Sequence, residues 1–120
     1  MNLLIEKISD LNDMMMQGDA LEAFEKFYDE SITIPVNDEL PIKGKDLNRL
    51  SKQDHFDNII DFKSAKPLKV TIGEQSTMVE WHMNYVHSEY GEKCYTQVAV
   101  QDWKDGKIIK EKLYCGIKQL

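Results

Sequence analysis

The stretch that decides the fold runs from Met78 to Ile117 and reads MVEWHMNYVHSEYGEKCYTQVAVQDWKDGKIIKEKLYCGI. It contains three runs rich in β-branched and aromatic residues, separated by two short turns that close on glycine. The turns are Glu89-Tyr90-Gly91 and Lys104-Asp105-Gly106. This pattern predicts an antiparallel meander of three strands. We expect the residues before it to cover one face of that sheet.

Three helices are expected before residue 78. Apolar residues recur at three- and four-residue spacing over residues 2–16, and a capping-box spacing begins a second helix over residues 20–28. A third helix is expected over residues 45–60. Its apolar side would consist of Leu47, Leu50, Phe56, Ile59 and Ile60.

Extended segments lie between and after these helices. Ser31–Val36 reads as an edge strand or a strand end, because Pro35 has no amide hydrogen to donate. A short run at Leu40–Lys43 follows a turn at 37–39, residues 61–66 read as a polar connector, and alternation from Leu68 to Ile72 predicts another strand. The fold class is therefore α+β, with three N-terminal helices on one sheet face and one domain over residues 1–120.

Composition narrows the function classes. The 120 residues are 42% hydrophobic and 30% charged, as in a globular protein, and the formal net charge is −6. Without clustered Lys and Arg we expect no nucleic-acid partner and no membrane partner. The start of the chain carries Glu6 and Asp10 where a secretion signal would be apolar, so we expect a cytoplasmic protein.

Neither a metal nor a cofactor is expected. The two cysteines form no CxxC pair and the three histidines have no metal-ligand spacing. No Gly-rich phosphate loop, HExxH motif or Ser-His-Asp order occurs in the chain. We expect Cys94 and Cys115 to be free thiols.

The length of the two turns decides which side chains face the helices, because a shift of one residue turns a strand over. A two-residue loop at Asp105-Gly106 would place Val100 across from Glu111. A three-residue loop beginning at Lys104 would place Ala99 there instead. We favour three residues at both turns.

Three-residue turns put a mostly apolar set of side chains on the covered face. Four members are polar and need hydrogen-bond partners if they are buried. They either bond one another, the backbone or water, or they line a cavity between sheet and helices. The set is Val79, Trp81, Met83, Tyr85, Tyr95, Gln97, Ala99, Gln101, Trp103, Ile109, Glu111, Leu113 and Cys115, of which Tyr85, Gln97, Gln101 and Glu111 are polar.

Glu111 is the candidate catalytic residue. Burial beside Leu113 and Trp81 would raise the pKa of its carboxyl, and such a carboxyl can act as a general base or acid. In the other register, Lys110-Glu111-Lys112 would be a solvated run of charges. The ligand-binding candidates on the covered face are Trp81, Met83, Tyr85, Gln97, Gln101 and Leu113.

The other candidate residues are less suited to a catalytic or binding role. His82 falls on the outer face, His87 lies near the cavity rim at a strand end, and Asp54-His55 is expected to be exposed on the third helix. Val98 and Val100 make the outer face of the middle strand apolar, which a second subunit would explain.

Two stretches resemble a known family. LEAFEKFYDESITIPV (Leu21–Val36), followed by Gly44-Lys45 at a helix start, and QDWKDGKIIKEKLY (Gln101–Tyr114) are similar to the SnoaL-like (polyketide cyclase) branch of the nuclear transport factor two-like superfamily. The resemblance covers nearly the whole chain. It implies a cone, in which a curved antiparallel sheet wraps against three helices around a pocket. It also implies a homodimer joined through the outer sheet face.

The residues that carry this superfamily's reactions differ here. Relatives include ketosteroid isomerases, polyketide cyclases and epoxide hydrolases, and the resemblance puts Gln101 where isomerases and cyclases keep an acid. The isomerase aspartate falls near Val36, and no tyrosine precedes Tyr28. We therefore predict a protein that binds a small apolar or aromatic molecule, with no reaction assigned.

Two alternatives remain open. The first is an isomerase, cyclase or hydrolase that acts on a small hydrophobic substrate, with Glu111 as general base and with Gln101 and Tyr85 stabilising negative charge. The second is a protein-interaction partner with a filled core.

Overall fold

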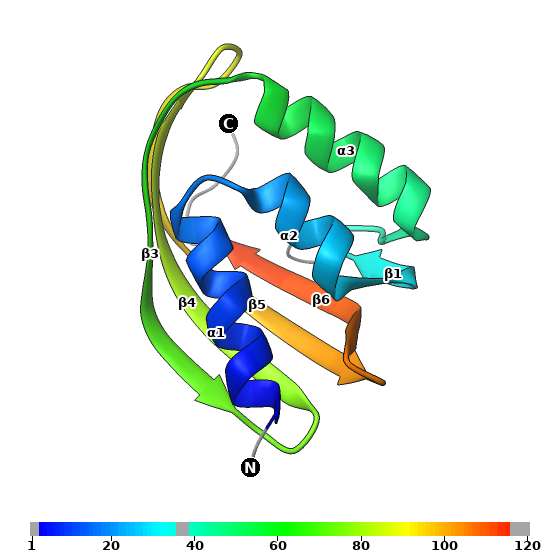
Figure 1. The fold of residues 1–120 in the computed structure, drawn as a ribbon. Coiled ribbons are helices and arrows are strands. Elements are labelled where there is room, and N and C mark those ends of the chain that lie inside the picture. The colour runs from blue at the N-terminus through cyan, green and yellow to red at the C-terminus, as the bar shows by residue number, and fades with distance from the viewer. Residues whose placement is uncertain (1–2, 36–38, 116–120) are drawn as a thin grey trace.

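Three helices cover the concave face of a six-stranded sheet in residues 3–35 and 39–115, the part of the chain that the computed structural model describes (Figure 1). The strands follow the order β2-β1-β6-β5-β4-β3 across the sheet. The elements are α1 (Leu3–Met16), α2 (Ala20–Phe27), β1 (Tyr28–Ile34), β2 (Ile42–Lys43), α3 (Lys45–Asp57), β3 (Ile59–Ile72), β4 (Ser76–His87), β5 (Gly91–Lys104) and β6 (Lys107–Cys115).

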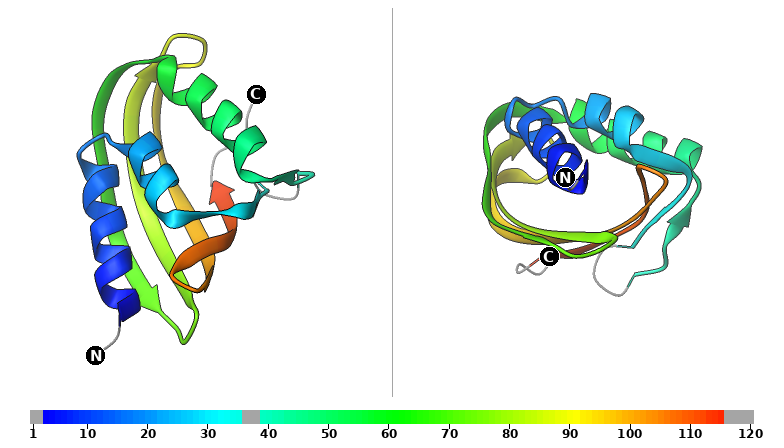
Figure 2. Two further views of the ribbon diagram at one scale, coloured as in Figure 1. Left: turned by 45° about the vertical axis from the view of Figure 1, so that its right-hand side comes forward. Right: turned by 60° about the horizontal axis from the view of Figure 1, so that its bottom comes forward.

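The predicted fold class is confirmed. The three helices lie on the inner side of a sheet that curves around them without closing (Figure 2). One detail differs from the expected antiparallel sheet, because β1 pairs with β6 in parallel and the sheet is mixed. No helix among the described residues is long and apolar enough to cross a membrane.

The polar connector predicted over residues 61–66 is wrong. These residues belong to β3, which pairs with β4 from Ile59↔His87 to Ile72↔Thr77. Three irregularities in the register bend the strand and break the alternation that sequence reasoning relies on. The long strand also lies at the sheet edge with an open outer face, where polar side chains are tolerated.

The three-residue turn predicted at Lys104–Gly106 is also wrong. Lys104 pairs with Lys107, and Asp105 and Gly106 form a two-residue turn with φ of 52° and 79°. Positive φ at both positions is the type I′ geometry that suits a tight hairpin. A register shift then follows, and Gln101 rather than Val100 or Ala99 lies across from Glu111.

This register shift restores most of the predicted faces. Ile108 pairs with Trp103 and is buried, so it takes the inward position that we predicted for Ile109. Beyond the shift, Glu111 and Leu113 face the helices as expected.

The earlier hairpin has a three-residue loop, as predicted, but one residue earlier in the chain. The loop is Ser88–Tyr90, so His87 pairs with Gly91. The pairing thus moves by two residues, which leaves every side chain of β4 and β5 on its predicted face.

The apolar side predicted for the third helix is wrong except at Phe56, which is half-buried. Leu47 and Leu50 are exposed, at 58% and 63%, and α3 ends at Asp57 rather than residue 60. The buried residues of α3 are polar, Lys45 and Asn48. Ile59 and Ile60 already belong to β3, and Ile60 is 69% exposed.

The other boundaries differ by a few residues. The second helix ends at Phe27, and β1 begins at Tyr28 instead of Ser31. Val36 and the first two residues of the turn predicted at 37–39 lie outside the described residues, as does Ile117.

The core lies between the sheet and the first two helices. Ile8 and Leu11 of α1 and Phe24 of α2 are among the largest fully buried side chains. From the sheet come Ile32, Val79, Trp81, Met83, Ala99, Trp103 and Ile108. α3 contributes no residue to this core, which leaves space beneath it.

Candidate functional site

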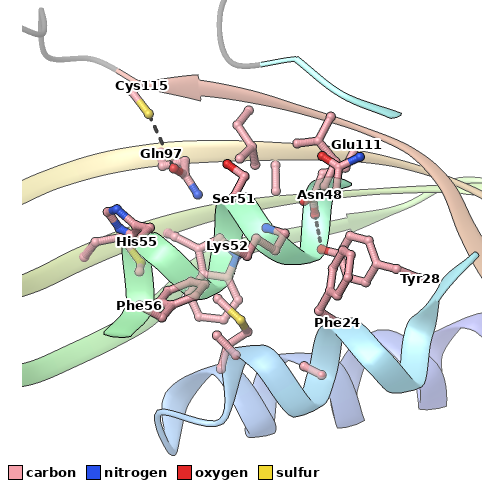
Figure 3. A pocket seen from close by; sticks show the side chains of 18 of the residues that line it. Phe24, Tyr28, Asn48, Ser51, Lys52, His55, Phe56, Gln97, Glu111 and Cys115 are labelled. Atoms are coloured by element: carbon pink, nitrogen blue, oxygen red, sulfur yellow. Dashed lines mark hydrogen bonds between the residues drawn. The ribbon is translucent and has the colours of Figure 1, made fainter. Parts of the chain in front are cut away.

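A cavity of about 560 Å³ lies between the sheet and the helices. All of the predicted site residues line it, namely Trp81, Met83, Tyr85, Gln97, Gln101, Glu111 and Leu113. Leu11, Phe24 and Ala99 add apolar wall, and α3 borders it with Asn48, Ser51, Lys52, His55 and Phe56 (Figure 3). A cavity of this size matches those that hold small organic molecules.

Glu111 is buried at one end of this cavity and is held by two neutral donors. The Tyr28 hydroxyl donates to its Oε2 at 2.6 Å, and Gln101 Nε2 donates to the same oxygen at 2.7 Å. β6, β1 and β5 supply the three side chains. Figure 3 shows Tyr28 of the helix–strand junction reaching toward Glu111.

The bonds behind Gln101 have a defined direction. The Trp103 indole can only donate, and it donates to Thr77 Oγ1 at 2.9 Å. The Thr77 hydroxyl therefore donates its own hydrogen to Gln101 Oε1, 2.6 Å away. This fixes the Gln101 amide with its nitrogen toward Glu111. Thr77, Gln101 and Trp103 are all buried, so the chain of bonds is shielded from water.

The second carboxyl oxygen of Glu111 is left for the cavity. Within residues 3–35 and 39–115, both donors reach Oε2 and none bonds Oε1. No ion pair within those ranges involves Glu111 either. A cation is nonetheless nearby, since Lys52 Nζ lies 5.7 Å from the ring centroids of both Phe24 and Tyr28.

Tyr28 is one of the site residues that sequence reasoning missed. We treated it as the end of the second helix, but it opens β1 and its hydroxyl reaches Glu111. Burial raises the pKa of Tyr28 well above its usual value, and the adjacent Glu111 charge raises it further. The phenol therefore stays a hydrogen donor. The available signal was the Tyr28 hydroxyl, a polar group at the end of the apolar side of the second helix.

Two tyrosines mark the other end of the cavity. The hydroxyls of Tyr85 and Tyr95 lie 2.9 Å apart, and His55 Nε2 lies 3.4 Å from Tyr85 Oη. Burial raises the pKa of both phenols, so both remain protonated at neutral pH.

We predicted that His55 is exposed, and this is wrong. His55 is half-buried at the cavity wall. Burial lowers its pKa, and the nearby His87 lowers it further. Its ring stacks on His87 with centroids 5.0 Å apart, and His87 stacks on Tyr90 at 4.6 Å. The inward position of His55 follows from the polar inner side of α3.

His87 is buried and faces inward at the end of β4. Its Nδ1 accepts the backbone N–H groups of Glu89 and Tyr90, so the hydrogen of the neutral ring is on Nε2. His82 lies on the outer face as predicted, with Nε2 3.4 Å from Cys94 Sγ.

Gln97 and Cys115 complete this second end. The Cys115 thiol donates to Gln97 Oε1 at 3.4 Å, and burial raises the thiol pKa. The bond turns Gln97 Nε2 toward the cavity (Figure 3). Neither Cys94 nor Cys115 forms a disulfide within the described residues.

Asn12 of α1 also lines the cavity and is only 6% exposed. Its Oδ1 is buried and has no hydrogen-bond partner among the described residues. Buried amides are normally satisfied, so Asn12 is a second polar group that a bound molecule could satisfy.

No group of three or more His, Cys, Asp or Glu in the described ranges is placed to hold a metal ion. The cavity is lined by two carboxyls, Glu39 and Glu111, by Lys52 and Lys93, by several amides and phenols, and by the His55 imidazole.

Solved structures share this fold. A protein from Mesorhizobium loti assigned to the SnoaL-like polyketide cyclases is 20% identical, with a TM-score of 0.75 over 95% of this chain and 99% of its own. One from Jannaschia sp. CCS1 with the same assignment is 10% identical, with a TM-score of 0.79 over 93% and 84%. A Mycobacterium tuberculosis LEH-like epoxide hydrolase is 11% identical, with a TM-score of 0.73 over 92% and 80%.

These similarities define the fold as the α+β cone of the SnoaL-like and nuclear transport factor two-like proteins. The fold that the resemblance implied is thereby confirmed. No family model matches the sequence, and no curated protein matches it.

Proposed function

We propose that this protein binds a small, largely apolar molecule in the cavity between its sheet and its helices. The observation that carries the proposal is the cavity itself. It has a volume of about 560 Å³, apolar walls, and a buried carboxyl with one oxygen that no described residue bonds. Apolar pockets with a few converging polar groups are typical of ligand sites.

The position of Glu111 Oε1 favours a second candidate function, general-base catalysis. A carboxylate oxygen that faces a cavity can remove a proton from a bound substrate. Gln101 would act here by holding Glu111, because its amide is already bonded at both ends. Tyr85 lies at the opposite end, next to Tyr95. Turnover by the wild type that Glu111→Gln abolishes would establish this function.

A substitution that fills the cavity tests the proposed binding. N-phenyl-1-naphthylamine, a neutral fluorophore that brightens in apolar surroundings, should bind the wild type. Ala99→Leu adds three carbons to the cavity wall and should weaken binding by about tenfold or more, because the same space cannot hold both. Fluorescence titration gives the two dissociation constants.

The control is Cys94→Leu, which enlarges an exposed side chain on the outer face of the same strand. It should bind the fluorophore as the wild type does. Absence of binding by the wild type, or equal binding by a folded Ala99→Leu variant, would show the proposal to be wrong.

We also propose that two copies associate through the outer sheet face. Met78 and Val100 are paired on neighbouring strands, as are Val98 and Tyr114. Met78 and Tyr114 are 46% and 42% exposed. Together these four side chains form an apolar patch across β4, β5 and β6, of the kind that subunit contacts cover.

A further inference from the structure

The two ends of the cavity have opposite hydrogen-bonding character. At the Glu111 end, no residue in the described ranges bonds Oε1, a carboxylate oxygen that can only accept when ionised. Tyr28 and Gln101 both donate to the other oxygen, Oε2, which leaves Oε1 to a bound molecule.

The opposite end presents donors. Tyr85 and Tyr95 carry two phenolic hydrogens, and their mutual bond uses one of them. The other is available to His55 or to a bound molecule. Gln97 adds an amide nitrogen that points into the same space, on the His55 side of the cavity and away from Glu111 (Figure 3).

The distance between the two ends sets the length of a ligand. Gln101, which bonds Glu111, and Tyr95 are both on β5 and six residues apart. Six residues span roughly 20 Å of strand, and inward curvature brings the side-chain tips closer than that. The wall between them is apolar, with Trp81, Met83, Ala99 and Leu113.

We propose that the ligand is an elongated apolar molecule with a hydrogen-bond donor, a hydroxyl or amino group, at one end and a carbonyl or carboxyl oxygen at the other. The donor end binds Glu111 Oε1, and the acceptor end binds Tyr95 and Gln97. This inference rests on the proposed binding function and specifies its ligand class.

The structure also predicts what Glu111→Gln does. Tyr28 and Gln101 continue to require an acceptor at the position of Oε2, so the new amide places its oxygen there. Its nitrogen then takes the position of Oε1 and presents N–H to the cavity. The substitution thus converts an acceptor into a donor without changing the shape of the site.

Two probes of similar length distinguish an acceptor from a donor at position 111. They are methyl ω-hydroxydecanoate and dimethyl decanedioate. The wild type should bind the hydroxy ester about tenfold tighter or more than the diester, which has no donor. In Glu111→Gln the dissociation constant of the diester divided by that of the hydroxy ester should fall by at least about tenfold. Calorimetric titration measures all four constants, and methyl ω-aminodecanoate shows whether an ammonium group replaces the hydroxyl.

Tyr95→Phe is the matched variant at the other end. It should weaken both esters by a similar factor and leave their ranking unchanged, because both carry the acceptor that Tyr95 binds. Equal affinities of the wild type for the two probes, or a preference for the diester, would overturn the inference while leaving the binding function intact. If the wild type binds the naphthylamine fluorophore but none of the three decanoate probes, the proposed ligand class is wrong. If it binds neither kind of molecule, the proposed function fails as well. If Glu111→Gln does not fold, the relative affinities of the wild type for the two esters still show whether the Glu111 end binds a hydrogen-bond donor.

Discussion

Burial of His55 at the cavity wall makes the stability of the protein depend on pH. The pKa of His55 is lowered in the folded protein, so the unfolded chain binds a proton more readily. His55 therefore favours folding fully above its unfolded pKa of about 6.5, and this contribution is lost as the pH falls below that value. Urea unfolding of the wild type should show a decline in stability in that range.

His55→Gln should reduce this decline, because Gln does not titrate. His82→Gln, on the outer face, is the control and should retain it. If all three proteins lose stability equally as the pH falls, His55 is not responsible.

Glu111 shows how far single residues could be placed from the sequence. Its inward direction followed from alternation along β6, and its neighbour Gln101 was expected on the same face. Their direct bond was not predictable, because it depends on the register shift between Asp102 and Trp103. Tyr28 and Thr77 were missed for a related reason, since each bonds a side chain on another strand.

At the scale of elements, α3 explains the largest error. We expected apolar residues to mark its buried side, and of these Phe56 does line the cavity. The other inward residues are Asn48, Lys52 and His55, because this helix borders a cavity instead of a packed core. Periodicity of apolar residues therefore succeeded for α1 and α2 and failed for α3. A helix whose inner side is polar cannot be oriented from hydrophobicity alone.

Asn48 secures α3 to the sheet. Its Nδ2 lies 3.3, 2.9 and 2.8 Å from the carbonyl oxygens of Ile32, Ile42 and Gly44. Asn48→Ala leaves these carbonyls without the amide and should lower the free energy of unfolding by about 1–3 kcal/mol. Gln53→Ala, at an exposed position of the same helix, should change it by less than about 0.5 kcal/mol. Equal losses in urea unfolding would contradict the role of Asn48.

At the scale of the whole molecule, the order of elements predicted the fold class and the side of the sheet that the helices cover. The curvature of the sheet, the length of β3 and the space under α3 were not predictable from local patterns, because they depend on irregular strand pairing. The resemblance to SnoaL-like proteins supplied the cone shape that periodicity did not.

Self-association belongs to this scale too. Val100→Arg puts a charge into the outer apolar patch and should convert a dimer into a folded monomer, because a charge buried in an interface is costly. Glu92→Arg changes an exposed position on the same face, at the start of β5, and should leave the dimer intact. Sedimentation velocity at tens of micromolar distinguishes the species, and a monomeric wild type would contradict the proposed interface.

The space between the sheet and the helices is the binding site that we propose. A crystal structure of the wild type with N-phenyl-1-naphthylamine would locate the bound molecule. We expect the fluorophore in contact with Trp81, Ala99 and Leu113, beneath α3. Fluorophore found only on the outer sheet face, with the inner space filled by protein side chains, would contradict it.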